Sequence, residues 1–283
     1  MLIDELRAGV RPEYAEPAAR TLVMGILNIT PDSFSDGGRF FSPQSAVGQA
    51  RKLVDDGADI VDVGGESSRP GAEPVSPEAE WARVAPVLEA LAGTGACVSI
   101  DTCHAGTARR ALKLGARIVN DITALGDPEM AGVVASAGCD CVLMHMQGMP
   151  QSMQNNPQYD DVVDDICNFF EERLAFAVKA GIGEQRLWLD PGFGFGKTPR
   201  HNLEILRRLG EFKKFGRPVL IGTSNKGTIG LVTGRPVEDR LEGTAATVAV
   251  AIANGADCVR VHDVRAMARV AQMADAIIYP PQV

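Results

Sequence analysis

The sequence predicts a (βα)8 barrel, or TIM barrel, in which residues 1–283 form a single domain. Short apolar segments and longer helical patterns alternate eight times along the chain. The apolar segments are nearly continuous rather than alternating, which is typical of parallel strands buried on both faces. The length of 283 residues slightly exceeds the ~250 residues of a typical barrel of this class. An open Rossmann-like sheet is disfavoured because NITPDSFSDGG, not GxGxxG, follows the first strand.

Residues 1–20 form an N-terminal extension before the first expected strand. They contain four carboxylates and lack the basic start and apolar run of a signal peptide. No apolar stretch approaches the ~18 residues of a membrane span. We therefore expect neither export nor a membrane partner, and we expect the protein in the cytoplasm.

Eight segments are predicted to be strands. Each is rich in β-branched and other apolar residues. They are Leu22–Asn28, Ile60–Gly64, Cys97–Asp101, Ile118–Asp121, Cys141–His145, Leu187–Asp190, Pro218–Gly222 and Cys258–His262.

A helix is predicted after every strand. Ser76-Pro77-Glu78 has a capping serine, proline at the first helical position and an early acid, which together indicate a helix start. The expected starts are Ser42-Pro43, Ser76-Pro77 and residues near His104, Asp127, Asp160, Pro199, Val237 and Val264. Most of these helices are expected to stop at a glycine, namely Gly57, Gly115, Gly138, Gly181, Gly216 or Gly255.

The composition excludes some classes of partner. The net charge is −8 and the sequence pI is near 5.1, which argues against a nucleic-acid-binding surface. The six cysteines include no CxxC pair, so reduced, buried thiols are expected rather than disulfides. Cys139, Cys141 and His145 lack the usual spacing of metal ligands, and His104 and His201 are interpreted as helix-start and surface residues.

Polar residues follow the predicted strands, at the barrel end where active sites of this fold lie. Asp101, Asn120 and Asp190 offer acceptors that suit the NH and NH₂ groups of a nitrogen heterocycle. Arg260, His262 and Lys226 offer donors for a phosphate-like group. The ends, in order, are Asn28, Glu66, Asp101, Asn120 with Asp121, His145, Asp190, Ser224 with Lys226, and Arg260 with His262.

A glycine-rich segment, DPGFGFGKT, covers residues 190–198. It differs from a phosphate-binding P-loop because Pro191 stands where the first glycine is required. Its glycines are interpreted as positions where the backbone closely approaches another part of the molecule.

Several longer motifs resemble dihydropteroate synthase, occur in that family's order and cover nearly the whole chain. They are MGILNITPDSFSDGGRF (24–40), DVGGESSRPGAEPVS (62–76), SIDT (99–102), NDI (120–122), LDPGFGFGK (189–197), RLEGTAA (240–246) and RVHDV (260–264). The resemblance implies an enzyme that joins a dihydropterin-methyl diphosphate to p-aminobenzoate and releases diphosphate. It also implies Mg²⁺, a homodimer and competition by sulfonamides.

The same resemblance implies roles for individual residues. Asp101, Asn120, Asp190 and Lys226 are expected to bind the pterin. Asn28 is expected to ligate Mg²⁺ and, with Arg260 and His262, to bind the diphosphate. The p-aminobenzoate site is expected at Ser68, Arg69, Pro70, Phe195 and Gly227, with Lys226 beside it. Loop 29–41, with Phe34 and Asp36, should close over the site; the expected catalytic set is Asp101, Lys226, Arg260, His262 and Asp36.

One segment departs from the family pattern and leaves two alternatives open. The family usually has S-R-K-S after strand seven, whereas this chain has Ser224-Asn225-Lys226-Gly227. The chain therefore lacks the planar, charged side chain of that arginine and the hydroxyl of that serine. We expect their absence to affect the binding of p-aminobenzoate and sulfonamides more than the binding of the pterin. A non-catalytic pterin-binding paralogue is therefore an alternative. A methyltetrahydrofolate:corrinoid methyltransferase is another, although it would not need the TPDSFSDGG and SSRPG loops.

Overall fold

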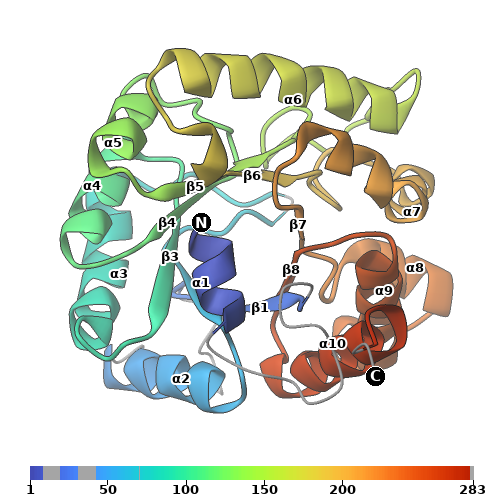
Figure 1. Cartoon of the computed structure of the whole chain (residues 1–283), viewed down its shortest axis with the longest axis horizontal. Helices are drawn as coiled ribbons and strands as arrows, with labels where there is room; N and C mark the ends of the chain where they lie inside the picture. Colours follow the sequence, from blue (N-terminus) through green and yellow to red (C-terminus); the bar gives the residue numbers. More distant parts are fainter. Residues whose placement is uncertain (9–19, 31–42, 70, 281–283) are drawn as a thin grey trace.

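The computed structural model describes residues 1–8, 20–30, 43–69 and 71–280. Within these ranges, eight parallel strands form one sheet in the order β6-β5-β4-β3-β2-β1-β8-β7. Leu189 of β6 and Val219, next to β7, form a parallel bridge between the two ends of the sheet. The sheet therefore nearly closes into a barrel, and the helices surround it (Figure 1). The predicted (βα)8 architecture is confirmed.

The strands are β1 Leu22–Asn28, β2 Ile60–Gly64, β3 Cys97–Asp101, β4 Ile118–Asp121, β5 Asp140–Met144, β6 Leu187–Asp190, β7 Leu220–Ile221 and β8 Cys258–Val261. Three strands differ from the prediction in their bounds. β5 lies one residue earlier, and β8 ends before His262. β7 is shorter at both ends, and before it the Val219 N–H donates to the Asp257 side chain (2.8 Å).

The helices are α1 Leu2–Ala8, α2 Pro43–Asp55, α3 Pro77–Leu91, α4 Ala105–Lys113, α5 Met130–Ala137, α6 Val162–Lys179, α7 Pro199–Arg207, α8 Gly227–Thr233, α9 Leu241–Ala253 and α10 Val264–Ile278. Ser76 caps α3 as predicted, since its hydroxyl accepts from the Ala79 N–H. Two starts were predicted too early. α9 begins at Leu241, after a 3₁₀ turn at Val237–Asp239. α5 begins at Met130, because the Asp127 side chain accepts from the Glu129 N–H in the preceding turn.

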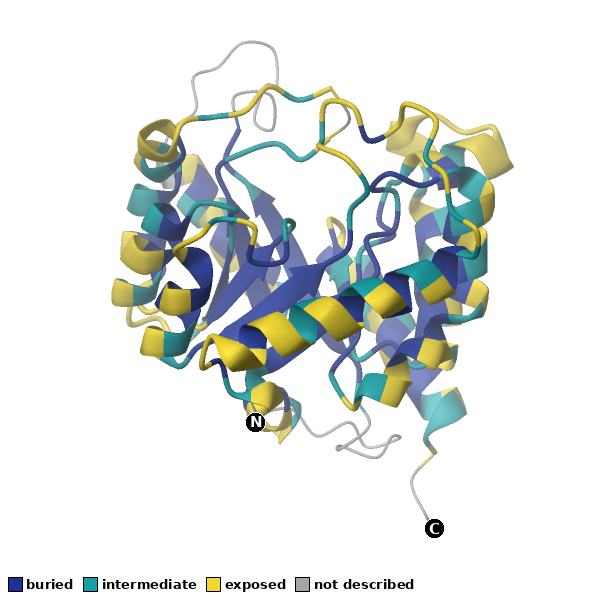
Figure 2. Cartoon of the chain, turned by 90° about the horizontal axis from the view of Figure 1, so that it is seen from above, coloured by how far each residue is buried: buried dark blue, intermediate teal, exposed yellow. Residues whose placement is uncertain are grey.

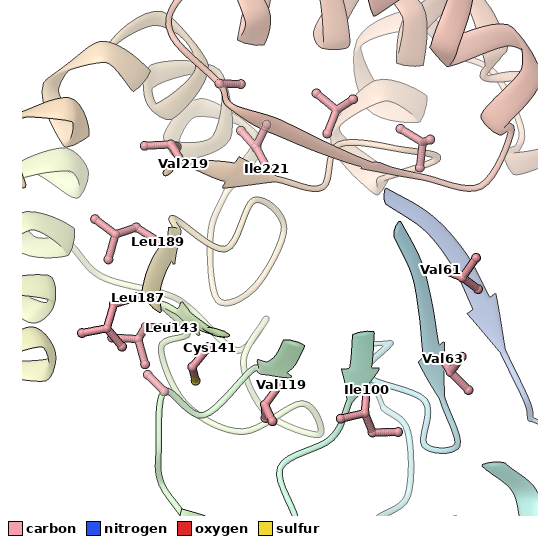
Figure 3. Packing of buried hydrophobic residues seen from close by; sticks show 14 of the residues in the cluster. Val61, Val63, Ile100, Val119, Cys141, Leu143, Leu187, Leu189, Val219 and Ile221 are labelled. Atoms are coloured by element: carbon pink, nitrogen blue, oxygen red, sulfur yellow. The ribbon is translucent and has the colours of Figure 1, made fainter. Parts of the chain in front are cut away.

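Alternate residues of each strand pack on opposite sides of the barrel wall, as the period of two requires. One set, including Val61, Val63 and Ile100, faces the surrounding helices (Figure 3). The other set forms an apolar layer inside the barrel: Leu22, Met24, Ile60, Cys97, Ile118, Val142, Trp188, Leu220 and Cys258. This alternation decides which of the polar strand ends can reach the barrel mouth.

Helix α1, which was not predicted, closes the bottom of the barrel. Leu2 and Ile3 pack onto the inner apolar layer. Ion pairs of Arg7 with Asp257 (3.0 Å) and of Arg117 with Glu5 (2.7 Å) attach the helix to the barrel. Figure 2 places this helix at the end opposite the long loops. The other end is therefore the place where a site can open.

All six cysteines are free thiols, and all but Cys103 are buried, in agreement with the expectation. Among the described residues, no helix is long and apolar enough to cross a membrane.

Candidate active site

A cluster of charged side chains from neighbouring strands lies above the inner apolar layer. Arg260 of β8 donates from Nε to Asp62 Oδ2 of β2 and from Nη2 to Asp101 Oδ2 of β3, each at 2.6 Å. Asn120 of β4 donates from Nδ2 to the same Asp62 oxygen at 3.0 Å. Asp62, Asn120 and Arg260 each lie two positions after an inward-facing apolar residue of their strand, and Asp101 lies four positions after one. The alternation therefore places all of them inside the barrel.

In this cluster two carboxylates share one guanidinium. Burial raises the pKa of Asp101 to about 7, and the charges of Asp62 and Glu80 act in the same direction, whereas Arg260 opposes them. Asp62 is fully buried, and its Oδ1 has no hydrogen-bond partner. The cluster thus offers acceptor capacity and excess negative charge to a ligand that carries N–H donors.

Asp190, at the end of β6, lies at the start of the glycine-rich segment. Its Oδ1 accepts from the Gly192 N–H at 2.7 Å, and burial raises its pKa to about 6. Gly192 has φ +67°, and a Cβ there would lie 1.9 Å from the His145 carbonyl oxygen. Gly196 has φ +62°, with the Gln147 carbonyl oxygen at 2.4 Å from such a Cβ. The predicted close approach is confirmed, and it fixes the backbone around Asp190.

His145 and Lys197 lie behind this segment rather than in the mouth. Lys197 Nζ is 2.9 Å from His145 Nδ1 and donates to the Phe195 carbonyl at 2.9 Å. Burial, and then Lys197, lower the pKa of His145 to about 2, and burial lowers that of Lys197 to about 7. A neutral imidazole therefore accepts from the lysine. The pair braces the loop that carries Asp190 and Phe195.

Lys226 and Phe195 lie together at the next position around the mouth. Lys226 Nζ lies 4.0 Å from the centre of the Phe195 ring, in a cation–π contact. Burial, followed by the charge of Arg260, lowers the pKa of Lys226 to about 8. Asn225 has φ +58°, a left-handed conformation that asparagine adopts more readily than most residues. Gly227 is exposed at the start of α8. This helix was not predicted from the sequence.

His262 is exposed at the rim and is oriented by Ser224. The Ser224 Oγ lies 3.0 Å from His262 Nδ1 and accepts from the His262 backbone N–H at 3.2 Å. The residue is exposed as a whole, but protein atoms around the imidazole partly desolvate it. This desolvation, and then the charges of Arg260, Lys226 and Arg69, lower the pKa of His262 to about 4. The ring is therefore neutral near pH 7 and can donate from Nε2 when the serine hydroxyl donates to Nδ1.

The other candidate residues are placed as follows. Asn28 ends β1 half-buried, and no hydrogen bond of its amide group is found within the described ranges. Ser68 is half-buried and Arg69 is exposed after β2. Phe34, Asp36 and Pro70 lie outside the described residues.

Three of the polar strand ends do not belong to the mouth. Asp121 and His145 fall on the outward alternation of β4 and β5. The Asp121 carboxylate instead accepts from Thr123 and Leu125 in the loop that follows (2.7–2.8 Å). Glu66 lies beside His104 instead of the Arg260 cluster. Sequence reasoning missed Asp62, although a charged residue in the middle of the apolar segment IVDVG was a usable signal.

Comparison with known proteins decides the family. A family model described as "Pterin binding enzyme" matches residues 24–262, which is most of the chain. The chain belongs to the pterin-binding enzyme family.

Similar members of this family carry one name. Dihydropteroate synthases of Synechocystis sp. and Bacillus subtilis are 47% and 46% identical over 261 and 272 residues. These alignments cover 91% and 95% of this chain and 90% and 92% of the relatives.

Solved structures agree. A sulfonamide drug complex of Yersinia pestis dihydropteroate synthase has a TM-score of 0.88 and 42% identity, covering 92% of this chain and 94% of that chain. The Xanthomonas albilineans enzyme in complex with 7,8-dihydropteroate has a TM-score of 0.83 and 39% identity, covering 95% and 97%. In this pterin-binding enzyme, the Asp62–Arg260–Asp101–Asn120 cluster and Asp190 thus surround the mouth of a barrel shared with those synthases.

Proposed function

We propose that this pterin-binding enzyme is a dihydropteroate synthase. It condenses (7,8-dihydropterin-6-yl)methyl diphosphate with 4-aminobenzoate and gives 7,8-dihydropteroate and diphosphate. The observation that carries the proposal is the buried cluster in which Asp62 and Asp101 share Arg260 beside Asn120. Its acceptors suit the donor edge of a pterin, and its cation suits a leaving diphosphate.

The pterin is held by Asp101, Asn120, Asp190 and Lys226 in this proposal. The carboxylates and the amide oxygen accept from the ring NH and NH₂ groups, which offsets the cost of burying them. Lys226 donates to the ring oxygen. Its ammonium lies beside Phe195, so it is restricted to a small region of the mouth.

Diphosphate departure comes first in the proposed reaction. The C–O bond breaks, its electron pair leaves with the diphosphate, and a resonance-stabilised dihydropterin methyl cation remains. Arg260 and the neutral His262 bind the departing anion, and the Asp101 carboxylate stabilises the cation. The amine of 4-aminobenzoate then attacks the methylene carbon and loses a proton.

Magnesium is proposed as the metal that accompanies the diphosphate. The Asn28 amide oxygen is a hard ligand at the end of β1, and Mg²⁺ commonly combines few protein ligands with phosphate oxygens and waters. Bound there, the ion would supply positive charge to the leaving group.

The 4-aminobenzoate side of the site is proposed at Phe195, Lys226, Gly227, Ser68 and Arg69, with Pro70. Arg69 faces the same rim as His262, whose pKa its charge lowers. Asp36 and the rest of loop 29–41 are proposed to exclude water, because water would hydrolyse the cation.

The decisive experiment incubates the purified chain with the pterin diphosphate, 4-aminobenzoate and Mg²⁺, and follows dihydropteroate and diphosphate. Formation of both in equal amounts is expected. The departure at Asn225 and Gly227 favours one competing function, a non-catalytic pterin-binding protein. Stoichiometric pterin binding without condensation would establish that function instead.

A homodimer in the cytoplasm is also proposed. Exposed apolar side chains lie on α8, α9 and α10, whose helices contact one another in series; they are Leu231, Val232, Leu241, Val250, Met273 and Ile277. Such a surface is typical of an interface between subunits. The free thiols agree with a reducing compartment.

A further inference from the structure

A second group of polar side chains lies beside the barrel mouth, where β2 and β3 end. Glu66 follows β2, and Cys103 and His104 stand between β3 and α4. One possible ligand atom from each of the three lies within 4.8 Å of the other two. All three side chains are partly accessible, so an ion can reach them.

Two carboxylates surround the histidine. His104 Nδ1 lies 3.1 Å from Glu80 Oε2 and 3.9 Å from Glu66 Oε2. Glu80 is fully buried on α3 and also accepts from the Thr102 hydroxyl at 2.8 Å. Arg83, one turn further along α3, donates to the Gly65 carbonyl at 2.7 Å instead.

The hydrogen bonding of this group is incomplete. Glu66 Oε2 and Glu80 Oε1 are buried atoms without a hydrogen-bond partner. A buried acceptor left unpaired costs about 1–3 kcal/mol, and more when it is charged. A cation bound by Glu66 would remove that cost for the Glu66 oxygen.

The charges around the group favour a cation as well. Glu66 and the fully buried Glu80 both approach the imidazole of His104. The one cation on the next turn of α3, Arg83, is directed to the Gly65 carbonyl. A divalent ion would supply positive charge there and would stabilise thiolate and carboxylate ligands together.

We propose that Glu66, Cys103 and His104 form a binding site for a divalent transition metal, Zn²⁺ in the first instance, with Glu80 orienting the histidine. Thiolate, imidazole and carboxylate are the ligands that zinc takes. Zinc ligands at about 2.0–2.3 Å from the ion lie roughly 3–4 Å apart in a tetrahedron. The possible ligand atoms now lie within 4.8 Å of one another and would move closer on binding. A fourth position stays open for water. The carboxylate beside His104 matches the outer partner that ligating histidines usually have.

The site differs from the proposed magnesium site in its ligands. It is built on a sulfur ligand, which magnesium does not favour. It would connect the loop that carries Ser68 and Arg69 to the start of α4. The proposal does not depend on the proposed reaction, because metal binding is measured directly.

The test is a Co²⁺ titration of the full-length, tag-free, metal-free chain, followed by absorption spectroscopy. One equivalent of Co²⁺ should produce a thiolate-to-cobalt charge-transfer band, and Zn²⁺ but not Mg²⁺ should abolish it. Cys103→Ser should remove the band, and His104→Asn should weaken binding at least about tenfold. The matched control is Cys139→Ser, since Cys139 is a free thiol outside the group; its band should remain.

The absence of a band in the unaltered chain, or a band that persists in Cys103→Ser, would overturn the proposal. If Cys103→Ser does not fold, thermal unfolding with and without Zn²⁺ replaces the spectrum. Zinc should raise the Tm of the unaltered chain and not that of His104→Asn. An equal rise in both would also overturn the site.

Discussion

In the proposed reaction Arg260 binds the diphosphate and also positions Asp101. Its contacts show how these two roles are linked. Its guanidinium is held by Asp62 and Asp101. A diphosphate must therefore bind an arginine whose orientation is already fixed, which lowers the entropy lost on binding. The same contacts keep Asp101 close to the place where positive charge develops.

Asp101→Asn tests the role of that carboxylate. We expect kcat to fall by about a hundredfold, because a stabiliser of the transition state is lost. Pterin affinity should fall much less, because the amide oxygen still accepts a hydrogen bond. Steady-state kinetics and pterin titration measure the two effects. Equal losses would count against cation stabilisation, whereas Asp190→Asn, the comparison variant, should weaken pterin binding first.

Lys226 should set an alkaline limit to activity. Its pKa is lowered to about 8, so the ammonium is lost at a lower pH than in free lysine. The cationic form predominates below that pH, and kcat/KM should decline as the pH rises through it. In Lys226→Arg the decline should move upward, since a guanidinium stays protonated. An unchanged pH profile in this variant would show that another group causes the alkaline decline in kcat/KM.

Asn225 is one of two residues, with Gly227, that differ from the S-R-K-S pattern expected after strand seven. Asn225→Arg should strengthen 4-aminobenzoate binding about two- to fivefold, the value of a cation–π contact of roughly 0.5–1 kcal/mol. It should also lower stability by about 1 kcal/mol, because φ is +58° there and arginine tolerates this conformation less well. Asn225→Gln, which lengthens the side chain without adding a charge, is the control. The same gain in both variants would rule out the cation–π contact as the cause.

At the scale of elements, the glycine-rich segment after β6 positions two side chains of the site, Asp190 and Phe195. Gly192 and Gly196 bring its backbone against the carbonyls of His145 and Gln147, and Lys197 anchors it from behind. Asp190 and Phe195 are thereby presented from a rigid loop. The segment works through its conformation, whereas a P-loop would bind phosphate with its backbone.

Gly192→Ala should destabilise the protein by more than about 2 kcal/mol, since the new Cβ would meet the His145 carbonyl oxygen at 1.9 Å in a left-handed conformation. Denaturant unfolding measures the change. Gly132→Ala is the control: Gly132 is exposed within α5 with nothing near its missing Cβ. It should stabilise by roughly 0.5–1 kcal/mol. Similar values for both variants would contradict the steric account.

At the scale of the whole molecule, the two ends of the barrel differ in character: one is apolar and covered by α1, and the other carries the charged cluster. The inner layer is apolar from its lower end, where α1 covers it, up to the Asp62–Arg260 level. Stability and chemistry are thus separated along the barrel axis. We propose that barrel and α1 unfold together as one domain.

Ile3→Ala should test this proposal. Ile3 is 2% exposed beneath the barrel, and its truncation should cost about 2 kcal/mol. The loss should appear as a lower Tm of one cooperative transition, and Asp4→Ala, exposed on the same helix, should change it little. A second, separate transition would show that α1 unfolds on its own.

The sequence by itself determined the eight strand–helix units, because buried parallel strands must be apolar and helices must be capped. It also determined which residue types gather at the strand ends, and its long motifs indicated the family. Side chains alternate in facing along a strand, but the sequence did not show which residue of each strand faces inward. For this reason Asp62 was missed, and Asp121 and His145 were expected in the mouth.

Only the tertiary structure decided which side chains meet. Arg260 contacts Asp62 and Asp101 across intervals of 198 and 159 residues, and no local pattern specifies such pairs. The helices α1 and α8 likewise depend on the barrel, because α1 buries Leu2 and Ile3 only where the barrel bottom accepts them. Closure of the barrel brings the polar strand ends together into one site, because it sets the distances between side chains on different strands.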